Sequence, residues 1–302
     1  MEEQLNPQKM SSEHAWFRVL LTGILLYFLG VLILIVTGSS NLFPTVVLLG
    51  SFLVPVTYVA FFYGRRYLSK LTMPVTALAF FYGGVLGVMA ASILEPIFVH
   101  QVDFSTFFTI GVIEEFAKIL GVLIIARRWR HDSEMDGLIL GAAAGMGFAA
   151  LESTGYAFSA FLHSGGSLSV TVGVTLLRGL LSPIGHGTWT AILASVLFRE
   201  SKDNQFHLNR KVIGAFLLVA VLHWLWDGLP GLLSAIFASG IDVFIGEALV
   251  GGLSLFILWL RWREARRLQI ERMEEEQQSN VDQIDDHSFK QYQDESALSD
   301  LN

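Results

Sequence analysis

Long apolar runs alternate with short polar links along most of the chain. A helix needs about 20 apolar residues to cross the hydrocarbon core of a bilayer, and several runs reach that length. We therefore predict membrane spans at roughly 17–37, 43–63, 74–95, 105–126, 137–162, 172–198, 212–238 and 241–261. This pattern predicts an all-α membrane protein, a polytopic bundle of about eight transmembrane helices.

The polar links differ in their content of basic residues. The links after the second, fourth and sixth spans are basic, as is the region after the last span, whereas the other links carry no Lys or Arg. The basic residues are Arg65, Arg66 and Lys70; Arg127, Arg128 and Arg130; Arg199, Lys202, Arg210 and Lys211; and Arg261, Arg263, Arg266 and Arg267. Basic links stay in the cytoplasm, so this alternation predicts that both termini are cytoplasmic.

Composition agrees with a membrane protein and excludes several kinds of site. Of the 302 residues, 53% are hydrophobic and 16% are charged, which is too apolar for a soluble domain. The absence of cysteine excludes disulfides, thiolate metal ligands and a cysteine nucleophile. The net charge of -7 comes largely from the C-terminal end, so it indicates no nucleic-acid partner. The partners expected from composition are the lipid bilayer and molecules within it.

The pattern divides the chain into three segments. Residues 1–16 form a polar N-terminal segment, 17–262 the membrane domain, and 263–302 a polar cytoplasmic tail. The first apolar run is expected to remain as a span, because no short run ends in a small-residue cleavage site. The tail is acidic and poor in aromatic side chains after about residue 278, so we expect it to be disordered there.

Two adjacent glutamates, Glu114 and Glu115, lie in the middle of the fourth apolar run. An ionised carboxylate in hydrocarbon costs several kcal/mol, so such a pair is retained only with partners or a water-filled cavity. The next three spans place Glu152, His186 and His223 at a similar depth. We therefore expect a catalytic core of four helices over residues 105–238.

Helical spacing supplies partners for these groups. Lys118 lies four residues after Glu114 and three after Glu115, on the same helix face as both. Asp227 lies four residues after His223 and is placed to orient its imidazole. The glycines of the fifth span are expected to let neighbouring helices approach closely; they are Gly137, Gly141, Gly145, Gly147 and Gly155.

These residue types point to hydrolysis. A glutamate can take a proton from water and return it to a leaving amine. Glu152, His186 and His223 form a set of one carboxylate and two imidazoles that suits Zn²⁺ and leaves a position for water, with Glu114 or Glu115 as the base. Alternatively, the histidines stabilise an oxyanion and no metal is used. Spacing alone does not separate the two glutamates; we take Glu115 as the base.

Other protease chemistries lack their motifs. The chain has no His-Glu-x-x-His and no Gly-x-Ser-x-Gly. An aspartyl dyad needs two buried aspartates, but only Asp227 lies deep, because Asp136 lies at a helix start.

Four segments, taken together, resemble the PrsW family of intramembrane proteases, which is related to the CAAX prenyl endopeptidases. They are Glu114-Glu115-Phe116-Ala117-Lys118, Phe148-x-x-x-Glu152, Ser182-Pro183 followed by His186, and His223-x-x-Trp226-Asp227. The resemblance covers roughly residues 105–230 and adds Phe148 as a supporting residue. Ser153 departs from it, because the family often has Asn there.

The resemblance implies a membrane-embedded endopeptidase of a bacterial cytoplasmic membrane. Its substrates would be membrane-anchored proteins, with anti-sigma factors as the example that the family offers. Related enzymes have been interpreted both as metal-dependent and as glutamate-driven without metal, so both mechanisms stay open.

Two other functions fit parts of the pattern. A proton-coupled transporter also uses chains of Glu and His, but the sequence shows neither inverted repeats nor matched broken helices. A catalytically inactive membrane scaffold would tolerate replacement of the glutamate pair. Four other charged residues are expected to be structural: Arg178 and Glu247 snorkelling or paired near outer span ends, and Glu95 and Asp103 solvated in a loop.

Overall fold

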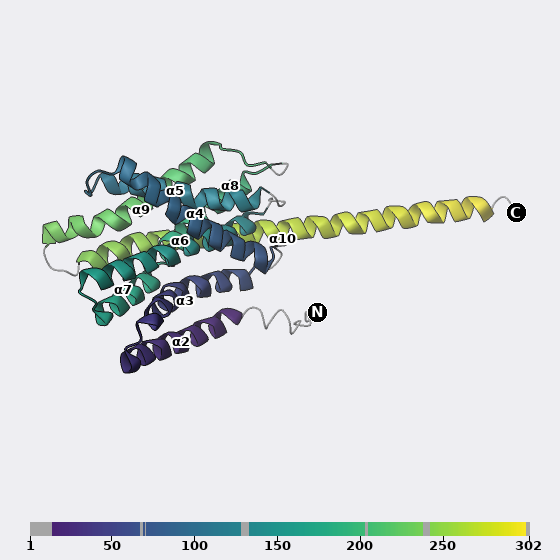
Figure 1. The fold of residues 1–302 in the computed structure, drawn as a ribbon. Helices are drawn as coiled ribbons and strands as arrows, with labels where there is room; N and C mark the ends of the chain where they lie inside the picture. Colours follow the sequence, from purple (N-terminus) through teal and green to yellow (C-terminus); the bar gives the residue numbers. More distant parts are fainter. Residues whose placement is uncertain are drawn as a thin grey trace.

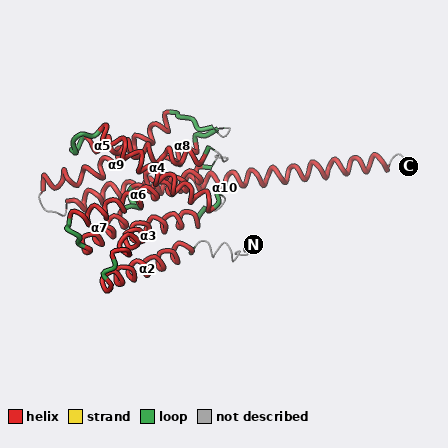
Figure 2. Tube along the Cα trace, in the orientation of Figure 1, coloured by secondary structure: helices red, strands yellow, loops and turns green. Residues whose placement is uncertain are grey.

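The computed structural model describes residues 14–66, 69, 71–127, 133–202, 205–237 and 242–299. This part of the chain is a bundle of α-helices, and Figure 2 shows no strand in it. The elements are α2 (Ala15–Thr37), η1 (Ser40–Leu42), α3 (Phe43–Gly64), α4 (Met73–Phe98), α5 (Thr106–Ala126), α6 (Glu134–His163), α7 (Leu168–Leu181), α8 (His186–Arg199), α9 (Arg210–Phe237) and α10 (Asp242–Ser299). The predicted all-α membrane fold is confirmed.

The number of spans depends on how α5 is counted. In the described residues, 7 segments are long and apolar enough to cross a membrane: α2, η1 with α3, α4, α6, α7 with α8, α9 and the first part of α10. α5 has 21 residues, but Glu114, Glu115 and Lys118 lie in its middle. With α5 included, the segments correspond one by one to the predicted spans.

The orientation of these spans remains a prediction. Lys70, Arg128 and Arg130, which support it, lie outside the described residues, as do residues 1–13 of the predicted N-terminal segment.

α6 is the central helix of the bundle (Figure 1), and it packs on α3, α4, α5, α7, α8 and α10. Every residue from 134 to 150 is buried. Close packing on α8 requires Gly145, because a Cβ atom there would collide with the carbonyl oxygen of His186. Gly147 similarly lies against the carbonyl oxygen of Phe80 on α4, whereas Gly155 has open space. The predicted role of the glycines therefore holds for the inner part of α6.

The sixth predicted span, 172–198, is broken, which corrects the prediction of one continuous helix. α7 ends at Leu181 and α8 begins at His186. Pro183 lies between them, and its missing N–H and fixed φ interrupt helical hydrogen bonding. The Thr188 hydroxyl donates to the Pro183 carbonyl at 2.6 Å and closes the turn. A hydropathy pattern does not register this break because the segment stays apolar. The break places His186 at the start of a helix.

The C-terminal part of α10 also differs from the prediction. The sequence predicts disorder after about residue 278, whereas the structure continues the helix to Ser299. No Gly or Pro follows Gly252, so no residue interrupts the helix. Figure 1 shows this part of α10 projecting alone beyond the bundle.

Candidate active site

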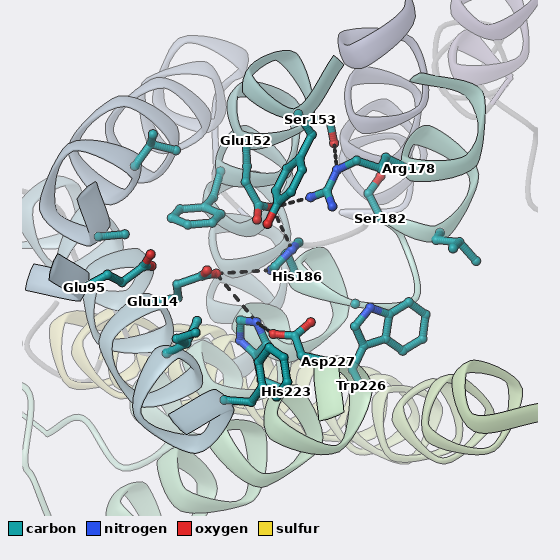
Figure 3. A pocket seen from close by; sticks show the side chains of 18 of the residues that line it. Glu95, Glu114, Glu152, Ser153, Arg178, Ser182, His186, His223, Trp226 and Asp227 are labelled. Carbon is teal, nitrogen blue, oxygen red and sulfur yellow. Dashed lines mark hydrogen bonds and ion pairs between the residues drawn. The ribbon is translucent and has the colours of Figure 1, made fainter. Parts of the chain in front are cut away.

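A cavity of about 450 Å³ opens among α4, α5, α6, α7, α9, α10 and the break before α8. Figure 3 shows that side chains from these separate elements point into it. Eight acidic, arginine or histidine side chains line the cavity: Glu95, Glu114, Glu152, Arg178, His186, His223, Asp227 and Glu247. The predicted convergence of four helices therefore occurs, and it occurs around a space that a substrate can enter.

Lys118 bridges the adjacent glutamates on α5. Its ammonium lies 3.0 Å from Oε2 of Glu114 and 2.8 Å from Oε1 of Glu115. It also lies 4.2 Å from the centre of the Phe148 ring, whose face attracts a cation. All four side chains are buried. A buried cation at this position compensates two like charges that would otherwise be very unfavourable in a membrane helix.

The two glutamates face different surroundings, because neighbours on a helix point about 100° apart. Glu114 lines the cavity, whereas Glu115 is 0% exposed and is not among the lining residues. Glu115 accepts hydrogen bonds from Lys118 and from Thr190 at 3.3 Å, and lies 3.1 Å from Nδ1 of His223. Glu114 is therefore the one of the pair that borders the cavity, whereas Glu115 contacts other side chains. The choice of Glu115 as the base stays a prediction.

His186 lies between a cation and an anion. Its Nδ1 is 2.7 Å from the Lys118 ammonium, and its Nε2 is 3.1 Å from Oε2 of Glu152. An ammonium can only donate, so Nδ1 accepts and the ring proton lies on Nε2, where Glu152 accepts it. The neighbours thus select one tautomer of His186.

His223, by contrast, lies among three carboxylates. Its Nδ1 lies near Glu115, and its Nε2 lies 3.4 Å from Oδ2 of Asp227 and 3.7 Å from Oε2 of Glu114. The ring of Trp189 packs against the imidazole with centroids 4.7 Å apart. The predicted support from Asp227 is therefore present, on a histidine that is 1% exposed.

Arg178 enters the site from α7. Its Nη2 donates to Oε2 of Glu152 at 2.7 Å, and its Nε donates to the Ser153 hydroxyl at 3.3 Å. The guanidinium also lies 3.9 Å from the centre of the Tyr156 ring. From the sequence, Arg178 was expected either to extend toward the membrane surface or to pair with an acidic residue; the structure shows the pair, with Glu152. Its partner Glu152 was predicted as a site residue, and Ser153 marks the departure from the family pattern.

One group in the described residues has the donors for a metal ion. Ligand atoms of Glu114, His186 and His223 all lie within 4.8 Å of one another, and the three side chains are buried. The predicted set had Glu152 as its carboxylate, but Glu152 lies on the far side of His186, bound to Arg178. One carboxylate and two imidazoles suit Zn²⁺, so the donor set fits. Lys118 already contacts Glu114 and His186 and would have to release both to a metal.

Sequence reasoning misplaced one residue of this cavity. Glu95 was expected in a solvated loop, but α4 continues to Phe98 and places Glu95 in the cavity wall. Glu247 lines the same cavity from α10. The sequence contained a signal for Glu95. This residue lies at the end of the apolar run 74–95, about three helical turns after its centre, where an acidic residue can still belong to the helix. Asp103 is exposed, as expected, and hydrogen bonds from Ser105 and Thr106 lower its pKa.

Comparison with known proteins agrees with this site. A family model described as "PrsW family intramembrane metalloprotease" matches residues 72–260, which is more than half of the chain. The matched range contains every ionisable side chain of the cavity wall. No curated protein and no solved structure matches the chain.

Proposed function

Because this chain belongs to the PrsW family of intramembrane metalloproteases, we propose that it cuts peptide bonds of membrane-anchored proteins at the cavity between α5, α6, α8 and α9. The observation that carries the proposal is the meeting of Glu114, Glu152, His186 and His223 around one space inside an apolar bundle. Each of these side chains comes from a different helix. Carboxylates and imidazoles at one cavity are the groups that move protons during hydrolysis.

Glu114 is the carboxylate best placed to activate water. It lines the cavity, and its Oε2 lies 3.8 Å from Nδ1 of His186 and 3.7 Å from Nε2 of His223. In the reaction, Glu114 takes one proton from water while the water oxygen bonds to the peptide carbonyl carbon. The carbon–nitrogen bond then breaks, and Glu114 returns the proton to the leaving amine. Atoms and charge balance with one water consumed.

The negative charge on the carbonyl oxygen requires donors. The imidazoles of His186 and His223 both border the cavity, and the Lys118 ammonium lies 3.0 Å from Oε2 of Glu114. Donors fixed before the reaction stabilise an oxyanion without reorganising at the moment of attack. Glu115 holds Lys118 and His223 in these places and so contributes as a positioning residue.

A Zn²⁺ ion held by Glu114, His186 and His223 would supply a water of lowered pKa and polarise the peptide carbonyl. In that state Glu114 would be a ligand, and Glu152 would be the proton acceptor left in the cavity wall. The family description as a metalloprotease supports this assignment, and the placement of Lys118 among the same ligand atoms supports the metal-free one.

The substrate follows from the place of the site. The cavity lies within helices that expose large apolar side chains to the bilayer, so it suits a substrate segment that arrives through the membrane. We propose membrane-anchored regulators of the anti-sigma-factor kind, in a bacterial cytoplasmic membrane with both termini of this chain in the cytoplasm.

The proposal is tested with the full chain in lipid nanodiscs and a panel of single-span reporter proteins that differ in sequence around the membrane segment. The wild-type chain should cut at least one reporter. Glu114→Gln, His186→Ala and His223→Ala should each lower cleavage at least about 100-fold with the fold intact. Glu271→Gln, on the exposed side of α10, is the matched control and should leave cleavage unchanged.

Zinc analysis of the same samples separates the two mechanisms. If the metal is used, Glu114→Gln loses bound zinc along with both histidine variants; without a metal, wild type is active and zinc-free.

Cleavage by all three site variants at the wild-type rate would reject a protease. Proton flux in vesicles would then support the transporter, to which the broken span is also suited, and no flux would support the scaffold.

A further inference from the structure

We propose that Arg178 is a positioning residue for the reaction, which clamps Glu152 and thereby fixes the orientation and tautomer of His186. This inference rests on the proposed function and adds to it a residue from outside the four motif segments. Arg178 lies in the last turn of α7, and Glu152 lies on α6. The contact between them lies in the cavity wall (Figure 3).

The geometry of Glu152 shows why a clamp matters. Its Oε2 receives two contacts, one from Nη2 of Arg178 at 2.7 Å and one from Nε2 of His186 at 3.1 Å. A charge-assisted bond of this length is among the stronger hydrogen bonds in proteins. Arg178 therefore fixes the oxygen that in turn accepts the His186 proton. Without it, the glutamate side chain is free to rotate toward solvent in the cavity.

Arg178 is itself held from two further sides. Its Nε donates to Ser153, and its guanidinium plane lies over the ring of Tyr156. These three contacts need a planar group with several donors, which Arg has and Lys lacks. Ser153 and Tyr156 lie on α6, one residue and one turn after Glu152. One helix thus presents an acceptor, a hydroxyl and a ring to the same guanidinium.

The clamp also spans the break in the sixth predicted span. Arg178 lies before the break and His186 directly after it, and both contact the same oxygen of Glu152. The position of His186 relative to α6 is thus set from both halves of the broken segment. A broken helix lacks continuous backbone hydrogen bonds to do this, so a side-chain link supplies the missing constraint.

The charges around the cavity favour this role over direct binding of an acidic substrate. Among the described side chains of the cavity wall, Arg178 is the one Lys or Arg, against the carboxylates of Glu95, Glu114, Glu152, Asp227 and Glu247. Its nearest anion belongs to the protein and is already bound. A substrate carboxylate would have to displace Glu152 and approach the other carboxylates.

Kinetics of Arg178→Gln and Arg178→Lys on the reporter cut by wild type test the inference. Loss of a residue that orients a catalytic or metal-bound histidine typically lowers activity about 10- to 100-fold. We expect that loss in kcat for Arg178→Gln, with KM within about twofold, and partial recovery in Arg178→Lys. The double variant with Glu152→Gln should be no slower than Glu152→Gln alone, because both changes break one link. Arg263→Gln is the matched control, since Arg263 lies on α10 over Trp259.

Each other outcome overturns the inference in a distinct way. An unchanged kcat in Arg178→Gln with a lower unfolding temperature would show that the contact between Arg178 and Glu152 only stabilises the helix bundle. A raised KM for reporters with acidic residues, at unchanged kcat, would show that Arg178 binds substrate. Additive losses in the double variant would separate Arg178 from Glu152. If the wild-type chain cuts no reporter, the proposed function itself fails. That failure is seen with the wild-type chain alone, whereas the outcomes above require an active wild type and a comparison with its variants.

Discussion

Two clusters of charged side chains share the helices α6 and α8, and they differ in kind. The first is the cavity cluster of Glu114, Glu115, Lys118, Glu152 and Arg178 with the two histidines. The second, here named the Arg261 cluster, consists of Glu134, Arg199, Arg261 and Glu264. Both involve α6 and α8; along α6 they are separated by roughly 27 Å, at 1.5 Å per residue.

The Arg261 cluster is balanced in charge. Arg261 contacts Glu134 and lies 2.7 Å from Glu264, and Arg199 lies 2.6 Å from the other oxygen of Glu264. The Arg261 guanidinium also donates to the Ser195 hydroxyl on α8. Two cations meet two anions, and none of these four side chains lines the cavity described above. The cluster ties α10 to α6 and α8.

The cavity cluster has more carboxylates than cations and borders a space. Around it are two imidazoles, which the Arg261 cluster lacks. The comparison teaches that a buried charge in a membrane helix does not by itself indicate chemistry. A reactive site is indicated when an excess of one charge, nearby imidazoles and a cavity occur together. Changes in the cavity cluster should therefore alter activity, and changes in the Arg261 cluster should alter stability.

The largest expected effect in this comparison comes from Lys118→Met. This change leaves Glu114 and Glu115 side by side without their shared cation. Breaking a buried ion pair from one side typically destabilises a protein by about 3–5 kcal/mol. We expect a comparable loss in the free energy of unfolding, measured in mixed micelles, together with loss of cleavage.

A second variant shows whether the charge is the cause. Lys118→Met with Glu115→Gln removes one of the two uncompensated anions and should recover part of the lost stability, though not activity. Equal stability of Lys118→Met and wild type would mean that the cavity already hydrates the pair, and the contrast between the clusters would weaken.

A smaller effect, on stability but not on activity, is expected from Arg261→Gln. It leaves Glu134, which is 3% exposed, without its cation. We expect a loss of about 3 kcal/mol in the free energy of unfolding, with kcat per folded molecule unchanged. Arg263→Gln, two residues away on α10, should change stability by less than about 0.5 kcal/mol. A fall in kcat at full occupancy of the folded state would show that the Arg261 cluster also shapes the active site.

The spans and much of the cavity cluster could be predicted from the sequence, because the length and spacing of apolar runs follow from the thickness of the bilayer core. The predicted span 17–37 corresponds to Ala15–Thr37, and 105–126 to Thr106–Ala126. The depth argument brought Glu114, Glu152, His186 and His223 to one cavity. Helical spacing likewise gave Lys118 its two partners and His223 its Asp227. Each of these inferences uses only position along a helix.

The rest depends on rotation and on contacts between helices, which spacing does not give. Which of the adjacent glutamates faces the cavity is set by the packing of α5 on α4 and α9. Arg178 lies near a helix end in the sequence, and its contact with Glu152 depends on how α7 packs on α6. Glu95 was placed in a loop because α4 extends further than its apolar run.

The smallest expected effect concerns an exposed ion pair beside the Arg261 cluster, between Glu200 at the end of α8 and Lys211 on α9; Arg199 of that cluster lies 3.6 Å from Glu200. The side chain of Lys211 is 63% exposed, and its ammonium lies 3.0 Å from Oε1 of Glu200. The other carboxylate oxygen of Glu200, Oε2, accepts a hydrogen bond from Asn209 at 2.6 Å. The hydrogen bond from Lys211 is the main cause that lowers the pKa of Glu200. Lys211→Met should cost about 0.2–1 kcal/mol of stability at neutral pH, because surface pairs are weak.

The pH dependence of this pair gives the sign of the effect. A carboxyl whose pKa is lowered by folding adds stability above its unfolded pKa, and this stability is lost as the pH falls through the lower, folded value. The difference in unfolding free energy between wild type and Lys211→Met should therefore be largest near pH 7 and shrink as Glu200 is protonated in acid. Denaturant titrations at several pH values measure it, and cleavage at neutral pH should stay at the wild-type rate. A difference that grows toward acid pH would mean that Lys211 acts through another group, and a fall in kcat would extend the active site beyond the cavity cluster.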